Sequence, residues 1–166
     1  MENSEARKII EEYHIGGSSA GTSYYVEKNE DSITVEAVPE ALEAVLGFLN
    51  EHMRRYECDQ KVRNEIRLAV EEIFVNICSY AYAFGSVEAR VVCRVVEEDS
   101  YLQIQFQDTG IPFDPLAKEE ADTSGRQFVE QEGGFGIHLV KKTMDEVSYE
   151  HSNGMNILKV KRFISK

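Results

Sequence analysis

Apolar residues follow regular spacings along most of the chain after residue 31. ITVEAV alternates with period two and predicts a strand, and EALEAVLGFLNEHMRRY has leucine and valine at helical spacing, with Pro39 at its first position. A second, longer helix is predicted from Asp59, as N-cap, to about Ala83, ending at Gly85. Its apolar stripe comprises Ile66, Val70, Ile73, Phe74 and Ile77.

The second half of the chain is rich in predicted strands. VEARVVCRVV and YLQIQFQ alternate with period two and predict an antiparallel hairpin in which Leu102, Ile104 and Phe106 face inward. IHLVKKTMDEV predicts a further helix, and VSYEH and MNILKVKRF predict two closing strands. This order predicts an α+β fold, a two-layer sandwich in which helices cover one face of a mixed sheet.

Two segments lack clear periodicity. Residues 1–31 combine a charged, helix-like piece with a Gly/Ser-rich stretch, and we interpret them as an extension that is either a docking arm or a poorly ordered tail. Residues 32–166 form the predicted domain. The aperiodic segment from Asp108 to Gly134 is long for a loop, which is usually explained by function or disorder.

Composition narrows the classes of partner and location. The formal charge of -12 argues against binding of nucleic acid or of an anionic membrane surface. No stretch approaches the ~20 apolar residues of a membrane helix, and the charged N-terminus does not resemble a signal peptide, so we expect a cytoplasmic protein. Cys58, Cys78 and Cys93 lack metal or redox spacing and are interpreted as reduced packing residues.

Glu72 and Asn76 lie four residues apart on the second predicted helix and therefore share one of its faces. That face is mostly apolar, and buried polar groups need partners. A divalent cation with its waters would satisfy both side chains, because it prefers oxygen ligands. An ordinary hydrogen bond within the helix is the alternative explanation.

Two further motifs carry candidate binding residues. Asp108 ends a predicted core strand and begins DTGIPFDP. Its side chain either accepts a hydrogen bond from an amine such as that of adenine or forms an Asx-turn. Gly110 permits close approach of the backbone to a ligand. EGGFGIHLV places Gly133, Gly134 and Gly136 at the start of a helix. These glycines either form an anion site for phosphate or act as a flexible hinge with an N-terminal cap. The chain has no P-loop and no GxSxG elbow.

Taken in order, AVEEIFVNICSYAY, DTGIPFDP and GGFGIHLVKKTMDEVSYEHSNGMNILKVKR resemble the three signature boxes of the gyrase, heat-shock-chaperone, histidine-kinase and mismatch-repair ATPase superfamily. The chain most resembles the anti-sigma-factor serine kinases, over roughly residues 32–166. The resemblance implies the Bergerat ATP-binding fold, with ATP and Mg²⁺ as cofactors. It makes Asn76 the magnesium ligand, Glu72 the base near the nucleophile and Asp108 the adenine anchor, with Gly110 beneath the base.

By the same resemblance, Gly133, Gly134, Phe135 and Gly136 form the turn at the phosphates, and residues 115–133 form a lid over ATP. Arg126 in this lid either meets the γ-phosphate or is a solvated surface residue. Two positions depart from the family pattern. Tyr80 stands where histidine is frequent, and Lys159 stands near the usual hydroxyl residue, where it either meets phosphate or faces solvent.

The resemblance implies an ATP-dependent protein serine/threonine kinase that phosphorylates a small antagonist protein and, in its other state, sequesters a sigma factor. The alternative is a nucleotide-gated binding switch with little or no kinase activity, in which ATP and magnesium order the lid. Homodimerisation is implied by the resemblance alone.

Overall fold

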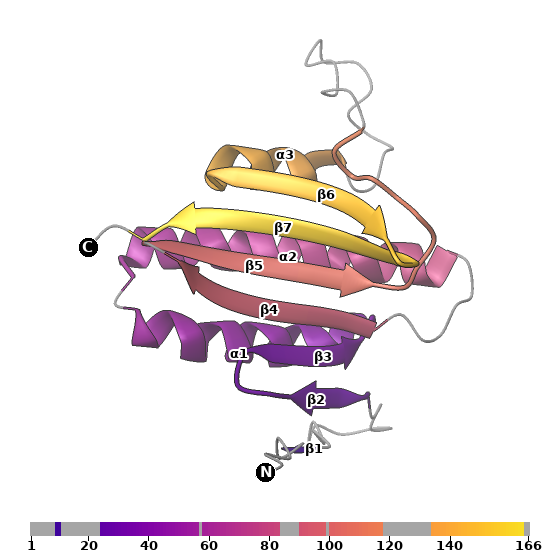
Figure 1. Cartoon of the computed structure of the whole chain (residues 1–166), viewed down its shortest axis with the longest axis horizontal. Coiled ribbons are helices and arrows are strands. Elements are labelled where there is room, and N and C mark those ends of the chain that lie inside the picture. The colour runs from indigo at the N-terminus through magenta and orange to yellow at the C-terminus, as the bar shows by residue number, and fades with distance from the viewer. Residues whose placement is uncertain are drawn as a thin grey trace, which may run out of the picture.

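A seven-stranded sheet with three α-helices on one face forms the described part of the protein (Figure 1). The computed structural model describes residues 9–10, 24–56, 58–83, 90–98, 100–117 and 134–164. The strands are β1 (Ile9–Ile10), β2 (Val26–Lys28), β3 (Ser32–Glu36), β4 (Arg90–Glu98), β5 (Tyr101–Asp108), β6 (Glu146–Ser152) and β7 (Met155–Phe163). The helices are the 3-10 turn η1 (Pro39–Ala41), α1 (Leu42–Arg55), α2 (Gln60–Ala83) and α3 (Gly134–Thr143).

The two-layer α+β prediction is confirmed, but the prediction of a mixed sheet is wrong. The strand order is β1-β2-β3-β4-β5-β7-β6, and every described pairing is antiparallel. Helix α3 connects β5 to β6, and these two strands run in the same direction. They do not pair, because β7 turns back from β6 and inserts between them. The turn uses Asn153 and Gly154, which both have positive φ, as a tight hairpin requires.

The predicted apolar stripes form the core between the sheet and the helices. On α2, Ile66, Val70, Ile73 and Phe74 are buried, and Ile77 packs partly against them. The helix begins as predicted, because the Asp59 carbonyl accepts the first helical hydrogen bond from the Arg63 amide at 2.9 Å. From the sheet, Leu102, Ile104 and Phe106 belong to the same core and are almost fully buried. Period-two alternation thus places one face of β5 in the core.

Part of the expected N-terminal extension belongs to the sheet. Strand β2 pairs with β3 over Val26–Lys28, and Tyr24 and Val26 are buried in the core. The segment is too short for its alternation to stand out from the polar residues around it. Residues 24–28 thus pack as part of the main sheet. The boundary between an extension and a domain at residue 31 stays a prediction.

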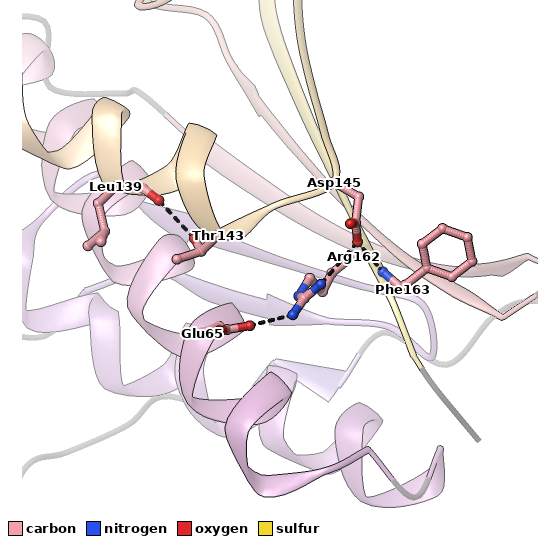
Figure 2. Close-up of polar contacts among 6 residues, drawn as sticks. All are labelled: Glu65, Leu139, Thr143, Asp145, Arg162 and Phe163. Atoms are coloured by element: carbon pink, nitrogen blue, oxygen red, sulfur yellow. Dashed lines mark hydrogen bonds and ion pairs between the residues drawn. The ribbon is translucent and has the colours of Figure 1, made fainter.

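Arg162 of β7 links α2 to the segment between α3 and β6 (Figure 2), at the opposite end of the β5–β7 pair from Asp108. Its Nη2 lies 2.5 Å from Glu65 Oε2 on α2, and its Nη1 lies 3.3 Å from Asp145 Oδ2 between α3 and β6. Asp145 Oδ2 also accepts a hydrogen bond from the Phe163 amide at 2.6 Å. The two carboxylates outweigh the opposing effect of burial and raise the pKa of Arg162. This cluster ties α2 to the end of α3 through β7.

Helix α3 begins at Gly134, three residues before the predicted Ile137, and ends at Thr143. In its last turn the Thr143 hydroxyl donates to the Leu139 carbonyl at 2.9 Å (Figure 2). The Asp145 amide then donates to the Lys161 carbonyl at 2.8 Å, so the chain enters the sheet there. The helix is therefore anchored at its C-terminal end, and Gly136 in its first turn lies against Glu72 of α2.

Candidate functional site

A cavity lies between α2, the C-terminal end of β5 and the start of β7. Two isoleucines of α2 and Leu158 of β7 make its wall apolar, and the segment after β5 covers one side. Its lining residues are Ile73, Asn76, Ile77, Asp108, Gly110, Ile111, Phe113, Pro115, Tyr149, Asn156 and Leu158. Its volume of about 50 Å³ is small, but a mostly apolar wall with a few convergent polar groups is the type of lining found in small-molecule sites.

The Asp108 side chain forms an Asx-turn, which is one of the two alternatives predicted for it. Only one of its carboxylate oxygens takes part. Oδ1 accepts the Gly110 amide at 2.9 Å. A β-carbon at Gly110 would lie 2.8 Å from that oxygen, so any larger residue would displace the Asp108 carboxylate from this turn. Within the described residues, Oδ2 of Asp108 has no hydrogen-bond partner. The turn and a ligand-accepting role are therefore compatible.

Glu72 and Asn76 lie on one side of α2, both half-buried, and they point to neighbouring hollows. Asn76 lines the cavity that contains Asp108 and Gly110. Glu72 lines a second, more open hollow with Gly136, His138, Leu139 and Lys142 of α3. No hydrogen bond joins the two side chains among the described contacts, so the intrahelical alternative is not formed.

Gly136 allows the first turn of α3 to approach Glu72 closely. A β-carbon on Gly136 would overlap Oε2 of Glu72 and lie 3.3 Å from its Cβ and Cδ. Any larger residue would therefore displace the carboxylate. This contact brings the predicted base and one of the predicted phosphate-turn glycines together, although they are distant in sequence.

Asn156 was missed by the sequence analysis, although it has the densest polar network in the cavity. It is 7% exposed and lies opposite Asp108 in the β5–β7 register. Its Nδ2 donates to Asp108 Oδ1 at 3.0 Å, and the Tyr149 hydroxyl donates to its Oδ1. A detectable signal existed, because Asn156 occupies the inward phase that continues with Leu158 and Val160.

Tyr149 of β6 supports this network from the side. Burial raises the pKa of Tyr149 above its ordinary value, and the nearby carboxylates of Asp114 and Asp108 add to this effect. The hydroxyl therefore stays protonated and keeps its role as a donor to Asn156.

Comparison with known proteins places this arrangement in a family. Residues 35–162 match the histidine kinase-like ATPase domain family. The chain belongs to this family. It is similar to the serine-protein kinase RsbW of Bacillus cereus strain ATCC 10987 and to that of Bacillus thuringiensis subsp. konkukian, each 29% identical over 101 residues. Each match covers 58% of this chain and 62% of the relative, so it spans less than two thirds of the relatives' length.

A solved structure supports the fold. The crystal structure of the RsbU and RsbW domains of Rv1364c from Mycobacterium tuberculosis superposes with a TM-score of 0.58 at 14% sequence identity. The superposition covers 84% of this chain and 34% of that one. At this identity the likeness concerns the fold alone, and it agrees with the two-layer architecture described above.

The donor set in the ATPase domain suits a nucleotide with a hard divalent cation. Asn76 lines the cavity and its carboxamide would offer a neutral oxygen to a cation, and Oδ2 of Asp108 has no hydrogen-bond partner among the described residues. The described residues contain no group of three or more His, Cys, Asp or Glu side chains that would hold a metal ion. A cation here would therefore need ligand oxygens in addition to Asn76.

Several predicted residues lie outside the described part of the chain. Gly133, Arg126 and most of the predicted lid, residues 118–133, are among them. Gly134 and Phe135 are the first residues of α3. Lys159 lies in the phase opposite to Asn156 and Leu158, with its Nζ 3.9 Å from Glu150 Oε1, which corresponds to the solvent-facing alternative. None of the helices in the described ranges is long and apolar enough to span a membrane.

Proposed function

We propose that this protein is a cytoplasmic, ATP-dependent protein serine kinase that phosphorylates a small antagonist protein and otherwise sequesters a sigma factor. One observation carries the proposal: Asp108 and Asn76 line a single cavity, and Glu72 lies one helical turn from Asn76 against the first turn of α3. Membership of the ATPase family and similarity to proteins named serine-protein kinase support it.

In this proposal the adenine base binds at the cavity, which has to widen from its volume of about 50 Å³ to hold the whole ring. Asp108 Oδ2 accepts a hydrogen bond from the exocyclic amine, and Gly110 lies beneath the ring. The turn from Gly133 to Gly136 meets the phosphates, because the free amides and positive dipole end of α3 favour anions. Arg126 and Phe135 complete the proposed contacts with ATP. Asn76 would hold magnesium, which supplies positive charge to offset the phosphates.

Glu72 is the proposed base. A carboxylate at this position orients or deprotonates the serine hydroxyl of the partner protein. Its contact with Gly136 restricts where the carboxylate sits, so the proposed base is held at the start of the helix that meets the phosphates. Catalysis would then depend mainly on positioning.

ATP binding is tested by calorimetry with and without magnesium, on the wild type and on Asn76→Ala. We expect magnesium-dependent binding by the wild type and loss of the magnesium dependence in the variant. Absence of binding to the wild type would overturn the nucleotide site and everything built on it.

The role of Glu72 is tested by Glu72→Gln, with Glu71→Gln as the matched control. Glu71 is the adjacent residue but is exposed on another side of α2, so its variant removes the same charge from the same helix. We measure transfer of labelled γ-phosphate to a candidate antagonist protein. A general base contributes about 100-fold or more, so Glu72→Gln should lose at least that much transfer while retaining ATP binding. ATP binding without transfer in the wild type would favour the nucleotide-gated switch.

A further inference from the structure

Both the nitrogen and the oxygen of the Asn156 carboxamide have hydrogen-bond partners. Its Nδ2 donates to Asp108 Oδ1 at 3.0 Å, to the Ile111 carbonyl at 3.0 Å and to the Gly110 carbonyl at 3.3 Å. Its Oδ1 accepts from the Phe113 amide at 3.2 Å and from the Tyr149 hydroxyl. All donors of the amide therefore face acceptors, and its oxygen faces donors.

This pattern determines the orientation of the amide. Rotating it by a half-turn would place its oxygen against two carbonyls and a carboxylate, and its NH₂ group against the Phe113 amide. Such unpaired buried contacts are costly. The single side chain thus links the end of β5 to the segment after it, at Gly110, Ile111 and Phe113, which lines the cavity.

The same pattern determines which oxygen of Asp108 remains for a ligand. Oδ1 accepts two hydrogen bonds, one from Asn156 and one from the Gly110 amide. A carboxylate oxygen saturated in this way leaves the other oxygen as the acceptor. The carboxylate cannot rotate without breaking both bonds, so the position of Oδ2 is fixed relative to the cavity wall.

We propose that Asn156 is the positioning residue that sets purine selectivity at this site. It acts through Asp108, because it holds Oδ2 where a purine must place a hydrogen-bond donor at its 6-position. A 6-amino purine provides that donor, whereas a 6-oxo purine places an acceptor there and is rejected. This inference rests on the proposed ATP site and adds the residue that determines its selectivity.

The test compares ATP with inosine triphosphate, which differs in this 6-substituent, by calorimetry with magnesium. The wild type should bind ATP at least about 100-fold more tightly, because a site built around a ligand donor rejects an analogue that lacks it. In Asn156→Ala only the Gly110 amide still holds Oδ1 of Asp108, so Oδ2 is less firmly positioned and the ratio of the two dissociation constants should fall at least about 10-fold. A purely structural role would weaken both nucleotides by the same factor, and that result would overturn the inference.

Tyr149→Phe keeps the proposal testable if circular dichroism shows Asn156→Ala to be unfolded. This variant removes one of the two hydrogen bonds that hold the Asn156 oxygen. The amide that donates to Asp108 is then less firmly oriented, although the partners of its Nδ2 remain. The ratio should fall in the same direction by about 2-fold or more, and an unchanged ratio would overturn the inference. Equal wild-type affinities would refute the inference alone, whereas absence of binding by the wild type to either nucleotide would refute the ATP site as well.

Discussion

Replacing Arg162 with methionine should destabilise the fold far more than the same replacement of an exposed charged residue would. The side chains of Arg162 and Glu65 are 21% and 23% exposed, so most of this ion pair is withdrawn from water. Removing one partner of a buried pair costs about 3–5 kcal/mol, and we scale this to about 2–3 kcal/mol because a fifth of each side chain remains hydrated. The loss arises mainly from Glu65, which is left without its cation.

The assay is urea unfolding followed by circular dichroism. With a slope of about 2 kcal/mol per molar urea, the midpoint of Arg162→Met should fall by about 1 M or slightly more. Lys159→Met is the matched control on the same strand, because its ion pair with Glu150 is long and exposed. That variant should change stability by less than about 0.5 kcal/mol.

A double-mutant cycle separates the ion pair from the packing of the long arginine side chain. In the Glu65→Met and Arg162→Met double variant, no Glu65 carboxylate is left without its cation, so the loss should be at least about 1 kcal/mol smaller than the sum of the single losses. Additive losses, or an Arg162→Met midpoint equal to that of the control, would refute the argument from burial.

Three further predictions follow from particular contacts. Gly136→Ala should leave the protein folded but displace the Glu72 carboxylate, reducing phosphate transfer at least about 10-fold in the labelled-ATP assay; unchanged transfer would contradict the contact. Burial lowers the pKa of His52, so the unfolded chain binds the proton more readily and the free energy of unfolding should decline as the pH falls below about 6.5. In His52→Leu the free energy of unfolding should lack this part of the pH dependence. The same pH dependence in the variant and the wild type would refute the prediction. Burial raises the pKa of Cys78 to about 12, so thiol reagents at pH 8 should label it only when denaturant unfolds the protein.

Local patterns were sufficient to predict most elements and part of the site. The period of 3.6 in α2 placed Glu72 and Asn76 on one side, and the end of the alternating β5 placed Asp108 at the edge of the core. Hydrogen bonds within each element and burial of one face determine these features, so they can be recognised in short windows of sequence. The roles of these residues toward ATP remain predictions.

Features that depend on distant partners could not be predicted in this way. Glu65 and Arg162 are 97 residues apart, and nothing in the surroundings of either residue indicates the other. The insertion of β7 between β5 and β6 likewise depends on which strand edge is available, and the order of the elements, from which a mixed sheet was expected, does not indicate this. The inward phase of β7 does indicate that Asn156 is buried, but the role of this side chain depends on partners distant in sequence, which no local pattern identifies.

The position of β7 has a consequence for folding during synthesis. This strand comes last in chain order among the described strands, yet it pairs on both sides and carries both Asn156 and Arg162. Until the ribosome has released it, β5 has an open edge, β6 has no described neighbour and the cavity lacks one wall. Closure must therefore wait for contacts between distant segments, which slows folding and leaves an exposed strand edge that is vulnerable to aggregation in the nascent chain.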